Sequence, residues 1–155
     1  MSYKRSSSAP TRGVAMAQQK TRSSSAAVAH KKATQTFLLP WPPSVNGMWR
    51  AVAGRNILSQ RYRLWREAAG RALRDQRPKE MFGPVRVAIE LSPPDARAFD
   101  LDNRVKPLLD LLVANRVISS DDHLTVREIS VSTGDGFAAS HGASARVTLM
   151  PAEKR

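Results

Sequence analysis

Residues 85–92 carry the clearest pattern in the chain, because apolar Val85, Val87, Ile89 and Leu91 alternate with polar, charged or small residues. This period of two predicts a β-strand with one buried face. Shorter apolar runs predict further strands over residues 36–39, 56–58, 124–132 and 145–149. The sequence therefore predicts a sheet whose best-defined strand lies near the middle of the chain.

Two features refine the predicted strands. In segment 124–132 the apolar phase shifts between Val126 and Ile129, as a β-bulge would cause. The prolines of Pro40-Trp41-Pro42-Pro43 end the first strand because they cannot donate ladder hydrogen bonds. Residues 44–47 follow as a predicted loop.

Helical spacing predicts a first helix after residue 58. Ser59 is a good N-cap, and the helix should continue to about Arg77. Gly70 in its interior indicates close packing at that point. The residues expected on its buried stripe are Tyr62, Trp65, Ala69, Ala72 and Leu73.

A second helix is predicted from about Asp102 to Ala114, on an apolar stripe of Leu101, Val105, Leu108, Leu109 and Leu112. Because Pro107 lies close to its start, the first turn should be irregular and the regular helix should begin near Lys106. Asn115 is expected to end the helix as a left-handed C-cap.

The order of elements predicts a small α+β domain with a mixed β-sheet and two main helices. We place this domain at residues 36–152. Residues 1–35 contain seven Lys and Arg residues, no acidic residue and few large apolar side chains. Such a segment cannot bury enough surface to offset its ordering entropy, so a disordered basic tail is expected. It is either an electrostatic arm on DNA or a leader foreign to the domain, since Met16 is an alternative start.

Composition limits the possible functions. The chain has 25 Lys and Arg against 13 Asp and Glu, a net charge of +12. This balance favours nucleic acid as partner, although a solubilising surface is an alternative. The absence of cysteine excludes disulfides, thiolate zinc sites and cysteine nucleophiles. No apolar run approaches the ~20 residues of a membrane span, so we expect a soluble cytoplasmic protein without a membrane partner.

Four acidic residues form the candidate metal site. Asp100 and Asp102 come just before the second helix, and Asp121-Asp122 precede the next predicted strand. Taken separately, these acids are typical of a helix cap and a turn. If the chain brings them to one end of the sheet, their repulsion would be relieved by a divalent cation. Mg²⁺ or Mn²⁺ suits such oxygen ligands, and one or two ions could support phosphodiester hydrolysis.

Lys106 lies one helical turn after Asp102, so it could hold the scissile phosphate. A surface ion pair with an acid is the alternative interpretation. Asp110 is interpreted as an ion-pair partner. His123, beside the acidic pair, is a weaker ligand candidate.

The candidate DNA-binding residues are aromatic and basic. Trp49, beside Arg50, is the best candidate for stacking on bases. Trp41 and Trp65 are interpreted as core residues. Arg63 and Arg66 belong to a helix in which arginines outnumber acids, which favours phosphate contacts.

Three motifs resemble the RusA family of Holliday-junction resolvases. They are Pro40-Trp41-Pro42-Pro43-Ser44-Val45-Asn46, then Asp100-Leu101-Asp102-Asn103-Arg104-Val105-Lys106-Pro107 with Asp110, then Val117-Ile118-Ser119-Ser120-Asp121-Asp122. With the order of elements, the resemblance spans about residues 36–150. The chain departs from the family pattern at Arg116, where the family often has glycine.

The resemblance implies a homodimer that binds four-way DNA junctions and nicks two strands symmetrically with Mg²⁺, in a bacterial or phage-infected host cell. It implies that Asp100, Asp102 and the second acid of the pair, Asp122, are catalytic, with Lys106 as an essential helper. Because Arg116 replaces the family glycine, the alignment with the family pattern can slip after this position. The choice between Asp121 and Asp122 therefore stays open.

Asn46, Asn103 and Arg104 lie in the motifs and are further candidate DNA-binding residues. The alternative from another class is a non-catalytic protein that binds branched or single-stranded DNA. A nuclease without junction preference is the second alternative.

Overall fold

Four strands form one mixed β-sheet in the order β1–β6–β4–β5. The computed structural model describes residues 33–134 and 142–153, and the strands are β1 (Gln35–Pro40), β4 (Val85–Ser92), β5 (Val126–Thr133) and β6 (Ser144–Pro151). β6 pairs antiparallel with both β1 and β4, whereas β5 pairs parallel with β4. The mixed sheet and the α+β class predicted from the sequence are therefore confirmed.

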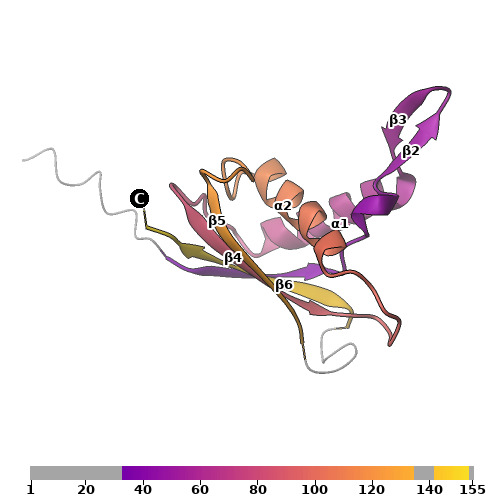
Figure 1. Cartoon of the computed structure of the whole chain (residues 1–155). Helices are drawn as coiled ribbons and strands as arrows, with labels where there is room; N and C mark the ends of the chain where they lie inside the picture. Colours follow the sequence, from indigo (N-terminus) through magenta and orange to yellow (C-terminus); the bar gives the residue numbers. More distant parts are fainter. Residues whose placement is uncertain (1–32, 135–141, 154–155) are drawn as a thin grey trace, which may run out of the picture. The chain divides into compact units, whose positions relative to one another are not determined.

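Both helices, α1 (Gln60–Asp75) and α2 (Val105–Ala114), cover the same face of this sheet (Figure 1). Every second residue of β4, from Val85 to Leu91, is buried beneath them. β6 contributes Ala145, Val147 and Leu149 to the same core. Each fully buried Leu, Ile or Val side chain contributes about 1.5–3 kcal/mol relative to exposure. This burial fixes which face of each strand and helix points inward.

Helix α1 begins as predicted. The Ser59 side chain accepts a hydrogen bond from the Tyr62 backbone N–H at 3.3 Å, which makes Ser59 its N-cap. Tyr62, Trp65, Ala69 and Leu73 are buried, and Gly70 is buried beside them; Ala72, also expected inside, is only half-buried.

The predicted irregular start of the second helix is also confirmed. A 3₁₀ turn, η2 (Asp102–Arg104), precedes α2, which begins at Val105. Pro107 is the third residue of α2, where its missing N–H would have had no partner within the helix.

The predicted left-handed C-cap at Asn115 is wrong by one residue. Asn115 has a φ of −97°, and the left-handed residue is Arg116, with a φ of 57°. The Arg116 N–H donates to Val113 O and the Val117 N–H donates to Leu112 O, which is a Schellman motif. This motif places the positive φ at the residue after the cap, so an unfavourable arginine occupies a position that suits glycine.

The bulge in the fourth predicted strand is confirmed. Val85 of β4 pairs with Val126, but the next residue, Arg86, pairs with Glu128, so Arg127 is the extra residue in β5.

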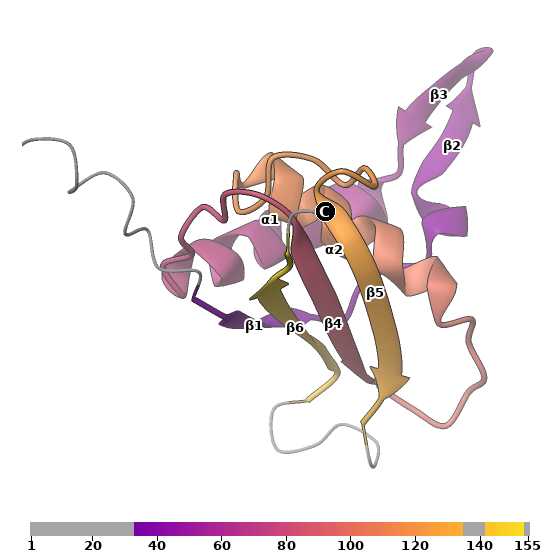
Figure 2. The ribbon, with the colours of Figure 1, turned by 60° about the vertical axis from the view of Figure 1, so that its left-hand side comes forward.

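The sequence interpretation missed a hairpin between the first strand and α1. The predicted short strand is β3 (Arg55–Leu58), and it pairs antiparallel with β2 (Trp49–Val52), which the sequence interpretation did not identify. The predicted loop at residues 44–47 contains a 3₁₀ turn, η1 (Val45–Gly47). Figure 2 shows the hairpin extending away from the sheet and helices.

The predicted tail, residues 1–35, lies almost wholly outside the described residues, and so do residues 135–141. Among the helices in the described part of the chain, none combines the length and apolar character that crossing a bilayer requires.

Replacing Arg116 with glycine should raise the free energy of unfolding by about 0.5–1 kcal/mol, because glycine adopts positive φ without steric cost. Arg116→Ala is the matched control: it removes the same charge but keeps Cβ, and it should bring no such gain. Urea unfolding of the three proteins measures the difference. Equal stabilisation by both substitutions would show that charge, not backbone conformation, is responsible.

Candidate functional site

The site is built on the backbone of the proline-rich segment Pro40–Pro43. The Trp65 indole N–H of α1 donates to Pro40 O at 3.2 Å. Two residues later, the Arg104 guanidinium of η2 donates to Pro42 O at 2.8 Å. Prolines hold this segment extended and leave its carbonyls available as acceptors. The segment therefore ties α1 to the loop that carries Asp100 and Asp102.

Arg104 is enclosed by aromatic rings. Its guanidinium carbon lies 5.1 Å from the ring centroid of Trp41 and 5.6 Å from that of Phe99. The two rings meet edge to face at 5.1 Å. Burial lowers the pKa of Arg104, Arg61 lowers it further, and Asp100 acts in the opposite direction. The cation–π contacts offset part of the cost of burying this charge. Arg104 thus holds the loop in place, and the DNA contact predicted for it stays a prediction.

Asn103 orients the first two acids. Its side-chain amide donates to Asp100 Oδ2 at 2.9 Å, and its backbone N–H donates to Asp102 Oδ1 at 2.9 Å. Both carboxylates are exposed. Their other oxygens accept no hydrogen bond from the part of the chain that the structure describes. One oxygen of each acid is positioned while the second stays available to a ligand.

Lys106, in the first turn of α2, links two other acids. Its ammonium lies 2.7 Å from Asp110 Oδ1 and 2.5 Å from Asp121 Oδ2. The hydrogen bonds to Asp110 and Asp121 raise the pKa of Lys106. The contact with Asp121 spans 15 positions in the chain and brings the acidic pair to the N-terminal end of α2. The contact brings Asp121 to the helix that follows Asp102, while the expected meeting of all four acids at one end of the sheet stays a prediction.

Asp122 has a different role from its neighbour. Its carboxylate oxygen Oδ1 accepts hydrogen bonds from the backbone N–H groups of Leu124 and Thr125, at 2.8 and 3.0 Å. Hydrogen bonds from Ser120 and from this turn lower the pKa of Asp122. Asp122 therefore shapes the turn that leads into β5, while the Asp121 carboxylate faces Lys106.

The donor set suits a hard divalent cation, because it consists of carboxylate oxygens. Within residues 33–134 and 142–153, however, no three Asp, Glu, His or Cys side chains lie close enough together to hold a metal ion. The Lys106 ammonium lies between Asp110 and Asp121 and balances their charge. The oxygen chemistry thus fits a metal, but the carboxylates would have to move closer together to bind one.

Five of the predicted DNA-binding residues lie in η1, β2 and α1. Asn46, in η1, and Trp49 and Arg50, in β2, are exposed. Arg63 and Arg66 line a hollow of about 410 Å³ between α1 and the end of α2, together with Leu58, Glu67, Gly70, Arg74, Ala114 and Asn115. A single acid beside three arginines leaves this hollow cationic. Trp41 and Trp65 pack against or within the core, as predicted.

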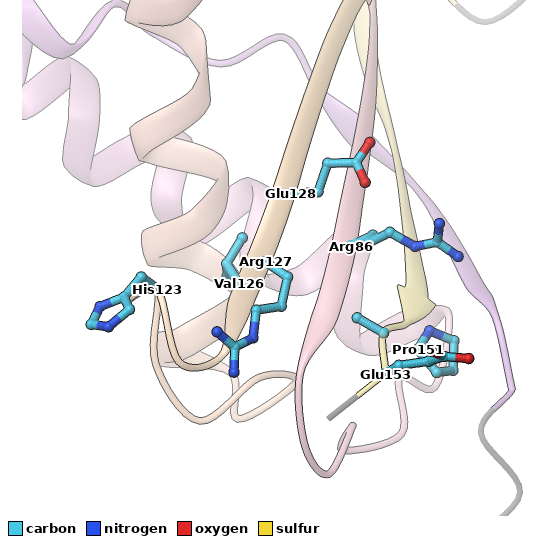
Figure 3. A pocket seen from close by; sticks show the side chains of 8 residues that line it. Arg86, His123, Val126, Arg127, Glu128, Pro151 and Glu153 are labelled. Carbon is cyan, nitrogen blue, oxygen red and sulfur yellow. The ribbon is translucent and has the colours of Figure 1, made fainter. Parts of the chain in front are cut away.

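His123 lines a second hollow, of about 920 Å³, with residues of β4, β5 and the end of β6. None of the four candidate acids lines that hollow. Figure 3 shows His123 pointing away from Arg86 and Glu128. The hollow carries charges of both signs, and His123 contributes to the lowered pKa of the neighbouring Asp122.

The roles of Phe99 and Asn103 in positioning the site were not identified from the sequence. Phe99 carried a signal, since an aromatic residue directly before two acids can pack and orient them. Asp110 was interpreted as an ion-pair partner, and its contact with Lys106 confirms this.

Comparison with known proteins agrees with this architecture. The family model described as "Endodeoxyribonuclease RusA" matches residues 40–149, from the proline-rich segment to β6. The crossover junction endodeoxyribonuclease rusA of Enterobacteria phage HK97 is 33% identical over 104 residues, which are 63% of this chain and 86% of the relative. Because the family match covers more than half of the chain, the protein belongs to the RusA family of endodeoxyribonucleases and is a nuclease.

Proposed function

We propose that this nuclease resolves four-way DNA junctions by paired symmetric nicks that depend on Mg²⁺, with Mn²⁺ as a substitute. The observation that carries the proposal is the contact of Asp121 with Lys106, which lies one helical turn after Asp102, within a basic protein. Family membership supports the substrate class, because the phage HK97 relative is described as a crossover junction endodeoxyribonuclease.

We assign the metal to Asp100, Asp102 and Asp121. When bound, the cation would lower the pKa of water and polarise a phosphodiester oxygen. Asp121 is preferred to Asp122 because the Asp122 carboxylate is engaged by two turn amides, whereas that of Asp121 faces the helix terminus.

Lys106 acts as a fixed positive charge. Its pKa is raised by Asp110 and Asp121, so the ammonium form dominates below the ordinary lysine pKa and is lost only as pH rises through the raised value. In the neutral range it therefore cannot accept a proton as a general base. If Asp121 turns toward the metal, Lys106 is released from one of its two partners and becomes available to a phosphate.

The basic surface contacts DNA mainly through phosphates, which position the substrate without reading its sequence. Asn46, Trp49, Arg50, Arg63 and Arg66 are the residues we assign to this surface. We propose a homodimer, since a four-way junction presents two equivalent cleavage points that a twofold enzyme matches.

Replacing Asp102 with asparagine should reduce Mg²⁺-dependent junction cleavage roughly a hundredfold or more, because it removes an anionic ligand. Binding to the junction should be unchanged or tighter, since a negative charge near the DNA is lost. Cleavage and gel-shift assays on a synthetic four-way junction measure both quantities. A variant that still cuts at the wild-type rate would remove Asp102 from the site.

The neighbouring acids give a matched pair of substitutions. Asp121→Asn should strongly reduce cleavage with little effect on thermal unfolding. Asp122→Ala should lower the midpoint of thermal unfolding, because the Leu124 amide loses its acceptor and the Thr125 amide loses one of its two, while cleavage well below that temperature persists. The opposite distribution, with Asp122 needed for cleavage and Asp121 dispensable, would reverse our assignment.

The stabilisation that Asp122 provides should depend on pH. Its pKa is lowered in the folded protein, so the stabilisation is present above the ordinary aspartate pKa and is lost as pH falls through the lowered value. The difference in thermal midpoint between wild type and Asp122→Ala should therefore shrink on strong acidification. A difference that stays constant from neutral to strongly acidic pH would contradict this role.

A further inference from the structure

The β2–β3 hairpin is explained only in part by the proposed DNA-binding surface, which includes Trp49 and Arg50 of β2 but no residue of β3. It forms a two-stranded sheet of its own, and seven of its eight strand residues are exposed. It extends away from the main sheet in both views (Figures 1 and 2). An isolated two-stranded hairpin is only marginally stable in water, so a partner that it contacts would account for its retention as a projecting arm.

Strand register divides the hairpin into two faces. Arg50 pairs with Ile57 and Val52 pairs with Arg55, so these four side chains share one face, here called the arm face. On this face Val52 is 40% exposed and Ile57 is 38% exposed. The arm face therefore presents two arginines and two aliphatic side chains to the outside.

The tip of the hairpin is narrow. Ala53 has a φ of 49° and Gly54 a φ of 73°, so both turn residues are left-handed, as in a two-residue type I′ turn. This turn type matches the twist of the strands and lets them continue to the tip. A tight tip of two small residues can enter a narrow space.

The base of the hairpin is anchored close to the acidic site. Met48 is buried, and its carbonyl accepts a hydrogen bond from the Ser59 N–H at 2.8 Å. The Ser59 hydroxyl donates to Gly47 O at 2.6 Å. The turn η1, just before β2, contacts η2, which contains Asp102 and Arg104. The base of the hairpin is thus in contact with the turn that carries Asp102. A ligand bound by the hairpin therefore has a defined position relative to the metal-binding acids.

Charge identifies the kind of partner. The first acidic residue of the chain is Glu67, so the arm and the first turn of α1 carry arginines without any nearby acid in the sequence. An isologous contact between two arms would bring Arg50 and Arg55 of both copies together, and like charges would repel. A polyanion gains from the same charges.

The aliphatic side chains Val52 and Ile57 indicate which kind of polyanion the hairpin binds. In continuous duplex DNA the base faces are stacked and closed to side chains, whereas at a branch point the end of each arm exposes a base pair. Apolar side chains on DNA-binding proteins insert at such weakly stacked steps, and projecting β-ribbons are among the elements that read DNA.

We propose that the β2–β3 hairpin enters the branch point of a four-way DNA junction, with Arg50 and Arg55 on phosphates and Val52 and Ile57 against exposed base pairs. This inference rests on the proposed junction-resolving function and assigns the junction preference to an element separate from the metal-binding acids. Junctions would then be selected by the arm, and cleavage would be performed by the acidic site.

The test uses the full chain with Asp102→Asn, so that the DNA is bound without being cut, and a junction carrying 2-aminopurine beside the branch point. Binding should increase the 2-aminopurine fluorescence, because inserted side chains unstack the base. Adding Val52→Ser and Ile57→Ser should abolish this increase. It should also lower junction affinity about tenfold or more, with affinity for linear duplex at the same salt nearly unchanged.

Leu124→Ser is the matched control, since Leu124 is 62% exposed and lies outside the arm, in the turn before β5. It should leave the fluorescence increase and both affinities as they were. Arg50→Gln with Arg55→Gln tests the arm independently of its apolar residues. It should weaken junction binding and reduce the salt dependence by about one unit of slope per arginine.

A fluorescence increase that survives both double substitutions would overturn the inference. A Val52→Ser, Ile57→Ser protein that loses its oligomeric state by light scattering would also overturn it, because the arm would then contact a second copy. Failure of the protein with intact Asp102 to cleave junctions would contradict the proposed function instead. The fluorescence result does not depend on cleavage, so the two failures are distinguishable.

Discussion

The site depends on the placement of one partly buried cation, Arg104. Its guanidinium lies against Trp41 and Phe99 and donates to Pro42 O, so it joins the segment after β1 to the turn that begins α2. Its Nε atom is buried without a hydrogen-bond partner among the described residues, which adds to the cost of burying the charge. Removing Arg104 would free the loop that carries Asp100 and Asp102, although the residue itself contacts neither the metal nor the reacting phosphate in our proposal.

The contacts of Lys106 explain how Asp110 and Asp121 can lie close together without a metal. Asp110 and Asp121 each lie within 2.7 Å of its ammonium, and all three side chains are partly exposed. Ion pairs at such exposure contribute little to stability, because water and salt screen them. A carboxylate in such a weak ion pair can exchange the lysine for a divalent cation at a low cost in free energy. A buried pair would resist that exchange, since breaking it leaves an uncompensated charge.

Rigid and projecting parts have separate tasks in this domain. The helices and the sheet bury a continuous apolar core, and the first turn of α2 carries Lys106, which contacts Asp121. The hairpin has almost no buried side chain of its own and depends on Met48 and Ser59 at its base. Because η1 and η2 are in contact, the hairpin that we propose to enter the junction and the acids that we propose to bind the metal lie next to adjacent turns. Selectivity and chemistry can therefore be altered separately.

The periodicity of the chain was enough to predict β4, both helices, the bulge in β5 and the mixed sheet, because burial of one face imposes a period on each element. The sequence also placed acids before a helix and before a strand, and its motifs indicated the RusA family. Only the tertiary structure distinguished Asp121 from Asp122, since their backbone positions are adjacent and their different partners lie at distant positions or in the turn. The tertiary structure also shows that the residue with positive φ is Arg116, not Asn115, and that β2 and β3 form a hairpin. β2 packs against no core, so its short sequence carries no periodic signal, and the pairing with β3 and the two-residue turn are what define it.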